Sequence, residues 1–484
     1  MYFIGIDIGT QGSRVIVADE YGSIVTKGIS KIKGRINIAN SDIFFEQNPK
    51  SWWECTRDSL GRAIYDFKSK GLNIKDIISI SVDGTSGTIL PLGKNNRVIR
   101  NAIMYKDQRA GSQSEKINKA GAETINKLGY KMKPSFGLSK ILWIKENEPD
   151  IYRESKYFIH QSDFIVGKLT GIFRISDHSN ALKTGFDLKE NIWPDYIEKK
   201  LKIDVNKLPE IIRPGEIIST ISSEISKEIG LHKDTFIVAG MTDSTASLFS
   251  SGVYRVGEFN TTIGTTLAIK GITKDLIKDI LGRVYCHLHP EGFWLPGGAS
   301  STGGECIESK FLGKDFKILD KEIESMDVTG LIAYPLIGVG ERFPFISKDA
   351  KGFIIGKPRN KYQLYKSYLE GVGFVERLCY EVLSNLGAKI KDRIFITGGG
   401  AKSNVWSKIR ASVMNKKLLK PRVEDTAMGA TIVAASKVFY KDIIQASKNM
   451  VKIDKTFYPE EIMVAKYSEV YNKFKKELNK RGYI

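Results

Sequence analysis

The stretch Gly5–Arg14, GIDIGTQGSR, places an acidic residue inside an apolar strand pattern and follows it with a small polar turn. Residues 3–9 and 14–18, FIGIDIG and RVIVA, predict two strands around that turn, and Ser23–Lys27 predicts a third. Small polar residues expose backbone N–H groups and hydroxyls, so the turn favours a phosphate cradle in which Asp7 would hold a hydrated Mg²⁺. An ordinary hairpin whose aspartate caps its own turn explains the stretch equally well.

Further along the chain, strand and helix patterns alternate. Pro49–Ser69 has apolar residues at helical spacing, and Ile77–Val82 is a short apolar run that ends at an aspartate. This alternation predicts an α/β fold. The carboxy-terminal stretch 441–484 is expected to be helical.

The pattern partly restarts after residue 250. Gly257–Ile269 again predicts strand, Gly-Thr turn and strand, and residues 394–400, IFITGGG, predict a buried strand before a helix at Asn404–Met414. We interpret this as a weak internal duplication. With 484 residues the length favours two domains, which we place at 1–250 and 251–484.

Composition excludes several classes of protein. The four cysteines are scattered without a CxxC pair, which predicts free thiols in a reducing compartment. Neither a signal-peptide pattern nor an apolar run of membrane-spanning length is present, so we expect a cytoplasmic protein without a membrane partner. The net charge of +19 raises the alternative of a nucleic-acid-binding protein, but the lysines are dispersed, so we expect no such partner.

Four further stretches carry candidate chemistry. Thr262–Thr266 repeats the small-hydroxyl turn, and either a second phosphate grip or a hairpin explains it. Gly398–Ala401 allows a close backbone approach, which favours a flat base lying there beside Asn404. Asp243 follows a buried strand, where it would accept a proton from an attacking hydroxyl or cap the next helix.

The fourth stretch combines two segments that suit a polyol. Residues 82–88, VDGTSGT, offer a carboxylate and small hydroxyls, and residues 104–109, MYKDQR, follow them. Asp107 and Arg109 are explained either by that pocket or by a plain surface pair. His287 and His289 fit alternating strand residues better than metal ligands.

In this order the pieces resemble the FGGY carbohydrate kinases, members of the actin, hexokinase and Hsp70 ATPase superfamily, over nearly the whole chain. GIDIGTQGSR and TTIGTTLAI look like the two phosphate motifs, VAGMTDSTAS like the catalytic segment, and FITGGGAKSN like the adenosine motif. The resemblance implies an α/β fold of two actin-like (ribonuclease H-like) domains, each a mixed central sheet flanked by helices, with an interdomain cleft. The amino-terminal domain would bind sugar, and the carboxy-terminal domain would bind nucleotide.

The resemblance also implies roles for residues of this chain, with ATP and Mg²⁺ as cofactors. Asp7 would meet the metal, and Asp243 would be the catalytic base and touch the substrate. The other substrate-binding residues would be Asp83, Gly84, Thr85, Ser86 and Asp107. The nucleotide and its phosphates would be held by Thr10, Gln11, Ser13, Arg14, Gly264, Thr265, Gly298, Thr302, Gly399, Gly400, Ala401 and Asn404.

The substrate segment departs from two branches of the family. Glycerol kinases carry Arg-Glu, and xylulokinases Met-His, where this chain has Thr85-Ser86. DGTSGT looks closest to the D-ribulokinase-like branch, which implies phosphorylation of D-ribulose to D-ribulose 5-phosphate. A xylulokinase or another FGGY sugar or polyol kinase is the nearest alternative, and an actin-like or chaperone-like ATPase scaffold without a sugar is the alternative from another class. Because family members are often dimers, the resemblance leaves a homodimer open.

Overall fold

The computed structural model describes residues 1–33, 37 and 43–484. These residues form two compact units, each assembled from three segments of the chain. Unit 1 comprises Met1–Ser250, His287–Gly292 and Asp425–Val451, and unit 2 comprises Ser251–Cys286, Phe293–Glu424 and Lys452–Ile484. The first segment of unit 1 ends where the sequence pattern restarts, but the segment from Asp425 to Val451 returns to unit 1 from the far end of the chain.

The sheet of unit 1 has six strands in the order β11-β12-β5-β1-β2-β3. Its strands are β1 (Tyr2–Ile8), β2 (Gly12–Asp19), β3 (Ile24–Lys31), β5 (Ile77–Gly84), β11 (Ile217–Thr220) and β12 (Phe236–Thr242). β1, β2 and β3 pair antiparallel, which confirms the predicted meander, whereas β1, β5 and β12 run parallel. The carboxyl ends of those three parallel strands therefore meet at one edge.

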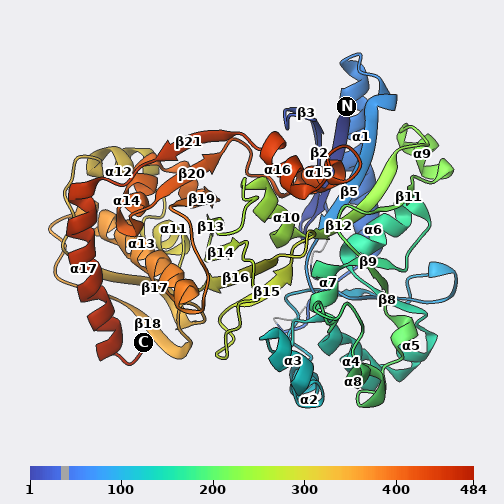
Figure 1. Ribbon diagram of the computed structural model, residues 1–484, viewed down its shortest axis with the longest axis horizontal. Helices are drawn as coiled ribbons and strands as arrows, with labels where there is room; N and C mark the ends of the chain where they lie inside the picture. Colours follow the sequence, from blue (N-terminus) through green and yellow to red (C-terminus); the bar gives the residue numbers. More distant parts are fainter. Residues whose placement is uncertain (34–36, 38–42) are drawn as a thin grey trace. The chain divides into compact units, whose positions relative to one another are not determined.

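Helices cover this sheet and bury its apolar residues. The helix predicted at Pro49–Ser69 is α1, and the Asn48 side chain caps its first turn. The returning segment supplies α15 (Thr426–Ser436) and α16 (Ile443–Met450), which lie beside the blue amino-terminal strands in Figure 1. A Cβ on Gly5 would stand 2.0 Å from the Ala427 carbonyl oxygen, so only glycine lets α15 pack this close to β1.

The remaining elements of unit 1 are helices and short strands. The helices are α2 (Gly111–Ala120), α3 (Ala122–Leu128), α4 (Gly137–Asn147), α5 (Pro149–Glu154), α6 (Gln161–Thr170), α7 (His178–Leu182), α8 (Asp195–Lys199), α9 (Ser223–Ile229) and α10 (Asp243–Ser250). The short strands are β4 (Glu46–Gln47), β6 (Leu90–Leu92), β7 (Ala102–Ile103), β8 (Tyr157–Ile159), β9 (Ile175–Asp177) and β10 (Glu210–Ile212), which pair in twos.

The sheet of unit 2 repeats the pairing pattern of unit 1. Its order is β15-β16-β14-β13-β19-β20-β21. The strands are β13 (Phe259–Ile263), β14 (Leu267–Gly271), β15 (Tyr285–Leu288), β16 (Trp294–Ser300), β19 (Arg393–Thr397), β20 (Lys417–Pro421) and β21 (Ile453–Phe457). An antiparallel meander of β13, β14 and β16 adjoins the parallel β19 and β20, and β21 closes the far edge antiparallel. The duplication predicted from the sequence is therefore confirmed in the order and direction of six strands.

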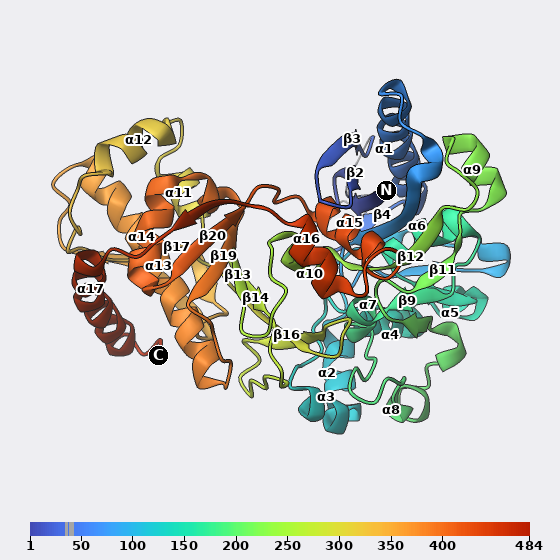
Figure 2. The ribbon, with the colours of Figure 1, turned by 45° about the horizontal axis from the view of Figure 1, so that its top comes forward.

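Helices α13 (Lys361–Asn385), α14 (Asn404–Met414) and α17 (Glu461–Lys480) lie together in unit 2, as both views show (Figures 1 and 2). Arg410 on α14 and Glu376 on α13 form a fully buried two-bond ion pair, with N···O distances of 2.7 and 2.8 Å. The unit also contains α11 (Glu305–Lys310), α12 (Phe316–Ile323) and the hairpin of β17 (Ile332–Glu341) and β18 (Ser347–Ile355).

Two expectations about the chain have a structural outcome. The stretch 441–484 is not helical throughout, because β21 pairs with β20 as an edge strand between α16 and α17. All four cysteines are free, as predicted, and all four are buried. Of the helices in the described part of the chain, none has the length and apolar character needed to cross a membrane.

Candidate functional site

Three parallel strands of unit 1 deliver aspartates to the same edge of the sheet. Asp7 at the end of β1 is in register with Asp83 near the end of β5. Thr242, the last residue of β12, is in register with Gly84, so Asp243 follows directly at that edge. The ends of parallel strands are where α/β proteins place their ligands. The structure thus brings together three aspartates that lie far apart in the sequence.

The carboxyl groups at this edge perturb one another. Burial raises the pKa of Asp7 to about 6; the nearby charges of Asp243 and Asp425 add to the rise, and the adjacent Asp83 side chain and the Arg14 charge oppose it. Burial, followed by the Asp7 charge, holds the pKa of Asp83 well above its usual range. Asp425 is the residue that caps α15 at its amino-terminal end, so the returning segment adds a fourth carboxylate.

This concentration of negative charge suits a divalent cation. The counter-charge at Asp7 is Arg14, whose Nη1 lies 3.8 Å from Asp7 Oδ2 and whose side chain is largely exposed. Among the described residues, no three His, Cys, Asp or Glu side chains already form a metal cage. Mg²⁺ does not need one, since it keeps several waters and binds through one or two carboxylates plus substrate phosphates. The donors present therefore fit Mg²⁺ better than a structural metal.

The turn after β1 exposes part of its predicted phosphate-binding set. The Gly9 N–H donates to the Gly12 carbonyl at 2.9 Å, and the Thr10 carbonyl accepts from the Gln47 amide at 2.8 Å, which fixes the turn. Gln11 and Arg14 are exposed, and Thr10 is half-buried. Ser13 is different, because its fully buried hydroxyl accepts from Ser59 on α1 at 2.9 Å. The structure does not bring the Ser13 hydroxyl to the exposed side of the turn.

The predicted sugar segment is a buried loop at the same edge. Thr85 donates its backbone N–H and its hydroxyl to Gln161 Oε1, at 3.0 and 2.6 Å. Its hydroxyl also lies 2.7 Å from that of Thr88. Both carboxylate oxygens of Asp83, the Ser86 hydroxyl and Gln161 Nε2 are buried and have no hydrogen-bond partner of good geometry within the described part of the chain. These unsatisfied groups are suited to binding the hydroxyls of a polyol.

Asp107 occupies a different environment from these groups. Its carboxylate accepts from the Arg109 guanidinium at 2.8 to 3.0 Å and from the Phe45 N–H at 2.6 Å. Both side chains are buried, so the alternative of a plain surface pair is wrong. Arg109 also pairs with Glu46 at 2.7 Å. Through these contacts Asp107 fixes the segment 104–109, and its role as a sugar ligand stays a prediction.

Asp243 is the first residue of α10, and its Oδ1 accepts from the Ser244 N–H at 2.6 Å. The preceding Thr242 N–H donates to the Ser179 hydroxyl at 2.7 Å, which ties the strand end to α7. The side chain is half-buried. Asp243 thus opens the helix, and its other role considered from the sequence, accepting a proton, stays a prediction.

In unit 2 the turn between β13 and β14 forms the centre of a second cluster of loops. The Gly264 carbonyl accepts from the Gly304 N–H at 2.8 Å, and the Thr265 carbonyl accepts from the Glu305 N–H at 3.1 Å. Gly264 and Thr265 are exposed. The predicted second phosphate turn is thus joined by its backbone to the start of α11.

The glycine run after β19 packs against the same turn. Gly398 has a φ of 86°, and a Cβ there would lie 2.6 Å from the Ile263 carbonyl oxygen. A Cβ on Gly400 would lie 2.8 Å from Ile263 Cβ, so these positions exclude larger residues. Gly399 is exposed, whereas Gly400 and Ala401 are buried. Asn404 opens α14 with an exposed side chain that Lys455 contacts at 3.3 Å.

The third part of this cluster is formed by Gly298 on β16 and by Thr302, which lies just after that strand. A Cβ on Gly298 would touch the Phe343 ring at 3.0 Å, and the Thr302 carbonyl accepts from the Leu267 N–H at 2.9 Å. Buried Glu341 holds the loop, because its carboxylate accepts from the Ser300 hydroxyl at 2.8 Å, the Ser301 N–H at 2.5 Å and the Thr302 hydroxyl at 3.2 Å. The Thr302 side chain therefore supports the loop rather than facing out of it.

Sequence reasoning missed four residues that complete these two sites. They are Gln161, Glu341, Glu424 and Asp425. Glu424 accepts from the Gly398 N–H at 2.7 Å and thereby fixes the glycine run. Asp425 had a local signal, since Asp-Thr before an apolar run is a helix start. The others reach their partners only through tertiary packing.

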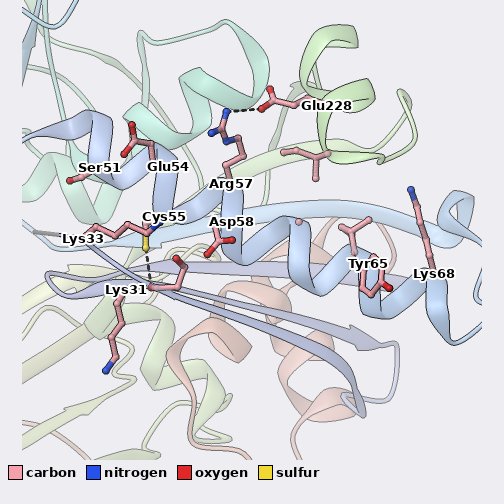
Figure 3. Close-up of a pocket in the computed structure, with 14 residues that line it drawn as sticks. Lys31, Lys33, Ser51, Glu54, Cys55, Arg57, Asp58, Tyr65, Lys68 and Glu228 are labelled. Atoms are coloured by element: carbon pink, nitrogen blue, oxygen red, sulfur yellow. Dashed lines mark hydrogen bonds and ion pairs between the residues drawn. The ribbon is translucent and has the colours of Figure 1, made fainter.

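A separate hollow of about 680 Å³ lies on unit 1, along α1 and next to β3 and α9 (Figure 3). Arg57 on α1 donates to Glu228 on α9 at 2.9 Å, and Cys55 donates to the Ser30 carbonyl at 2.9 Å. None of the predicted site residues lines this hollow.

Comparisons with known proteins agree with this architecture. Residues 2–250 match the amino-terminal domain of the FGGY family of carbohydrate kinases, and residues 284–438 match its carboxy-terminal domain. A xylulose kinase of Bacillus subtilis is 25% identical over 98% of this chain and 96% of its own. A gluconokinase of the same organism is 26% identical over 93% and 90%. The structure of Plasmodium falciparum glycerol kinase with ADP shares the fold, with a TM-score of 0.86 at 18% identity over 98% of both chains.

The two matched domains together span well over half of the chain. Both sheets have the mixed pairing of that family's two actin-like domains, and each carries one of the two clusters described above. The protein therefore belongs to the FGGY family of carbohydrate kinases and is a sugar phosphotransferase.

Proposed function

We propose that the protein transfers the γ-phosphate of ATP to the primary hydroxyl of a ketopentose, with D-ribulose as the preferred substrate. The observation that carries the proposal is the edge of unit 1, where Asp7 and Asp83 lie on two adjacent parallel strands and Asp243 directly follows the third. One site there offers a carboxylate for a metal, a buried carboxylate for a sugar and a half-buried carboxylate for a proton. A scaffold ATPase needs only the first of these.

Asp243 orients the attacking hydroxyl and accepts its proton. Because phosphoryl transfer passes through a loose transition state, positioning and neutralisation of charge contribute more than the basicity of this carboxylate. Asp83 and the Ser86 hydroxyl bind sugar hydroxyls: the Ser86 hydroxyl is buried without a hydrogen-bond partner among the described residues, and the buried Asp83 carboxyl has the Asp7 side chain beside it. A sugar that lacks one of those hydroxyls leaves a buried polar group unpaired and is rejected.

Asp7 is the residue that would hold Mg²⁺, which when bound neutralises charge on the phosphate oxygens. Gln11 and Arg14, on the same turn, contact the phosphates from unit 1. Unit 2 binds the nucleotide: the exposed Gly264 and Thr265 meet the phosphates, and the Gly399 backbone with Asn404 meets the adenosine. The related glycerol kinase, whose structure contains ADP, supports this choice of nucleotide.

The identity of the sugar rests on the loop 83–88. At Thr85 and Ser86 this chain has neither the arginine that glycerol kinases carry there nor the histidine that xylulokinases carry there. Gln161 instead holds Thr85 by two hydrogen bonds. That difference favours D-ribulose. The names of the similar proteins, xylulose kinase and gluconokinase, favour D-xylulose as the second candidate, because it is also a ketopentose.

The test is ADP formation from MgATP with D-ribulose, L-ribulose, D-xylulose, ribitol, glycerol and gluconate. The proposal predicts that one ketopentose exceeds every polyol and acid in kcat/KM by about 100-fold or more, and that this ketopentose is D-ribulose. A preference for D-xylulose would overturn the assignment of the sugar but not of its class. A preference for glycerol or gluconate would overturn the class itself.

A further inference from the structure

Lys140 is a fully buried lysine of unit 1. It lies on α4 (Gly137–Asn147), and none of its surface is exposed. Its ammonium donates three hydrogen bonds, to the carbonyl oxygens of Gly87 at 2.8 Å, Met104 at 2.7 Å and Ser135 at 2.9 Å. No carboxylate of the described residues lies within ion-pair distance of it.

This arrangement is costly and therefore calls for a reason. Burial of an ammonium without a counter-ion disfavours its charged form, and burial indeed lowers the pKa of Lys140 well below its usual range. The charged groups that act on it are Asp107, which opposes that change, and Lys183 and Arg109, which add to it. A leucine or methionine would fill the same space without that cost.

The three acceptors explain what the charge does. An ammonium has three N–H donors, and here each finds one carbonyl from a different segment of the chain. Gly87 belongs to the loop after β5, Met104 to the segment that leads to Asp107, and Ser135 to the loop before α4. A single atom thus ties together three segments, of which the first two are also joined by an antiparallel bridge between Ile89 and Ile103.

Neighbouring contacts connect the segments held by Lys140 to the predicted sugar ligands. A Cβ on Gly87 would lie 2.8 Å from the Ser135 carbonyl oxygen, so the two loops touch. The Thr88 hydroxyl accepts from the Tyr105 N–H at 3.2 Å and lies 2.7 Å from the Thr85 hydroxyl. The backbone of residues 84–88 is therefore fixed from one side by Lys140 and from the other by Gln161.

We propose that Lys140 is a positioning residue for the sugar: it holds the loop 84–88 in the shape that presents Asp83 and Ser86 to the substrate. The inference rests on the proposed function, because it takes this loop as the sugar site. Lys140 itself does not touch substrate. Its removal should weaken sugar binding and leave nucleotide binding in unit 2 unchanged.

The test compares Lys140→Met with Lys145→Met on the same helix. Lys145 also donates to a backbone carbonyl, that of Leu201 at 2.7 Å, and it loses the same charge, but its partner lies outside the sugar loop. We expect Lys140→Met to raise the KM for the sugar by about tenfold or more, with the KM for ATP within about twofold of the wild type. Lys140→Gln keeps two N–H donors, so its KM for the sugar should lie between those of the wild type and Lys140→Met. Lys145→Met should keep both KM values.

Equal changes in both KM values, or a loss of thermal stability with an unchanged sugar KM, would reduce Lys140 to a structural residue and overturn the inference. A second measurement uses the wild-type enzyme and does not depend on the folding of a variant. Sugar should slow hydrogen exchange of amides in 84–88, 104–107 and 135–137 together. Protection confined to 84–88 would contradict the inference that Lys140 couples the three segments. If the wild type phosphorylates no sugar, the proposed function fails first, whatever the variants do.

Discussion

Replacing Asp7 by asparagine should make the fold more stable at neutral pH while abolishing phosphoryl transfer. Burial raises the pKa of Asp7 from its ordinary 3.8 to about 6, so the native state binds the proton more tightly than the unfolded chain does. That stabilisation is complete below about pH 3.8 and is lost as the pH rises through about 6. This rise in the pKa of Asp7 corresponds to about 3 kcal/mol of stabilisation, since each tenfold change in proton affinity is worth about 1.36 kcal/mol. Asparagine resembles the protonated acid and does not incur this loss.

Urea unfolding of wild type and Asp7→Asn between about pH 4 and pH 8, without Mg²⁺, measures the effect. The two proteins should be equally stable near pH 4, and the variant should gain up to about 3 kcal/mol by pH 8. Asp66→Asn, at an exposed position on α1, is the control for the chemical change itself. A difference that does not depend on pH, or a variant less stable at pH 8, would refute the reasoning about this carboxylate.

Three further changes test other parts of the account. Glu341→Gln replaces an acceptor of several N–H and O–H groups with an amide, so we expect the KM for ATP to rise by about tenfold with the sugar KM unchanged, in steady-state assays. Gly398→Ala forces a side chain onto a φ of 86° and into a backbone oxygen, and should cost about 1–3 kcal/mol in urea unfolding, more than Gly313→Ala, where φ is 72° but the space is open. Arg410→Met leaves Glu376 buried without its partner and should cost about 3–5 kcal/mol, part of which Glu376→Gln should restore in the double variant.

The strands and the helix starts could be predicted from the sequence because their signals are local. Apolar runs interrupted by glycine turns located β1, β2, β13 and β14. The bounds of α1 and α14 agree with the predicted ranges, since Asn48 and Ser403 cap them through their own side chains. The edge strand β21 was missed because its sequence, IDKTF, is mostly exposed and becomes a strand only by pairing with β20.

The candidate site could be predicted only in part, for a related reason. Asp7, Asp83 and Asp243 each lie near or just after the end of an apolar run, which is a pattern visible in sequence, and the parallel pairing then brings them together. Lys140 and Gln161 lack such a pattern, because their partners lie on segments far away in the chain. Asp107 and Arg109 show the same limit: their spacing left a plain surface pair open, and only tertiary packing buries both side chains as an ion pair.

The central claim is that this protein phosphorylates a ketopentose and that Asp243 takes the proton. The most direct measurement is ³¹P NMR of the reaction of D-ribulose and MgATP with wild type and with Asp243→Asn, together with nucleotide titrations of both proteins. The account predicts a new phosphate monoester coupled to a CH₂ group with the wild type, none with the variant, and similar nucleotide affinity for both. Product formation by the variant at the wild-type rate, or ATP hydrolysis to inorganic phosphate without a sugar phosphate, would contradict it.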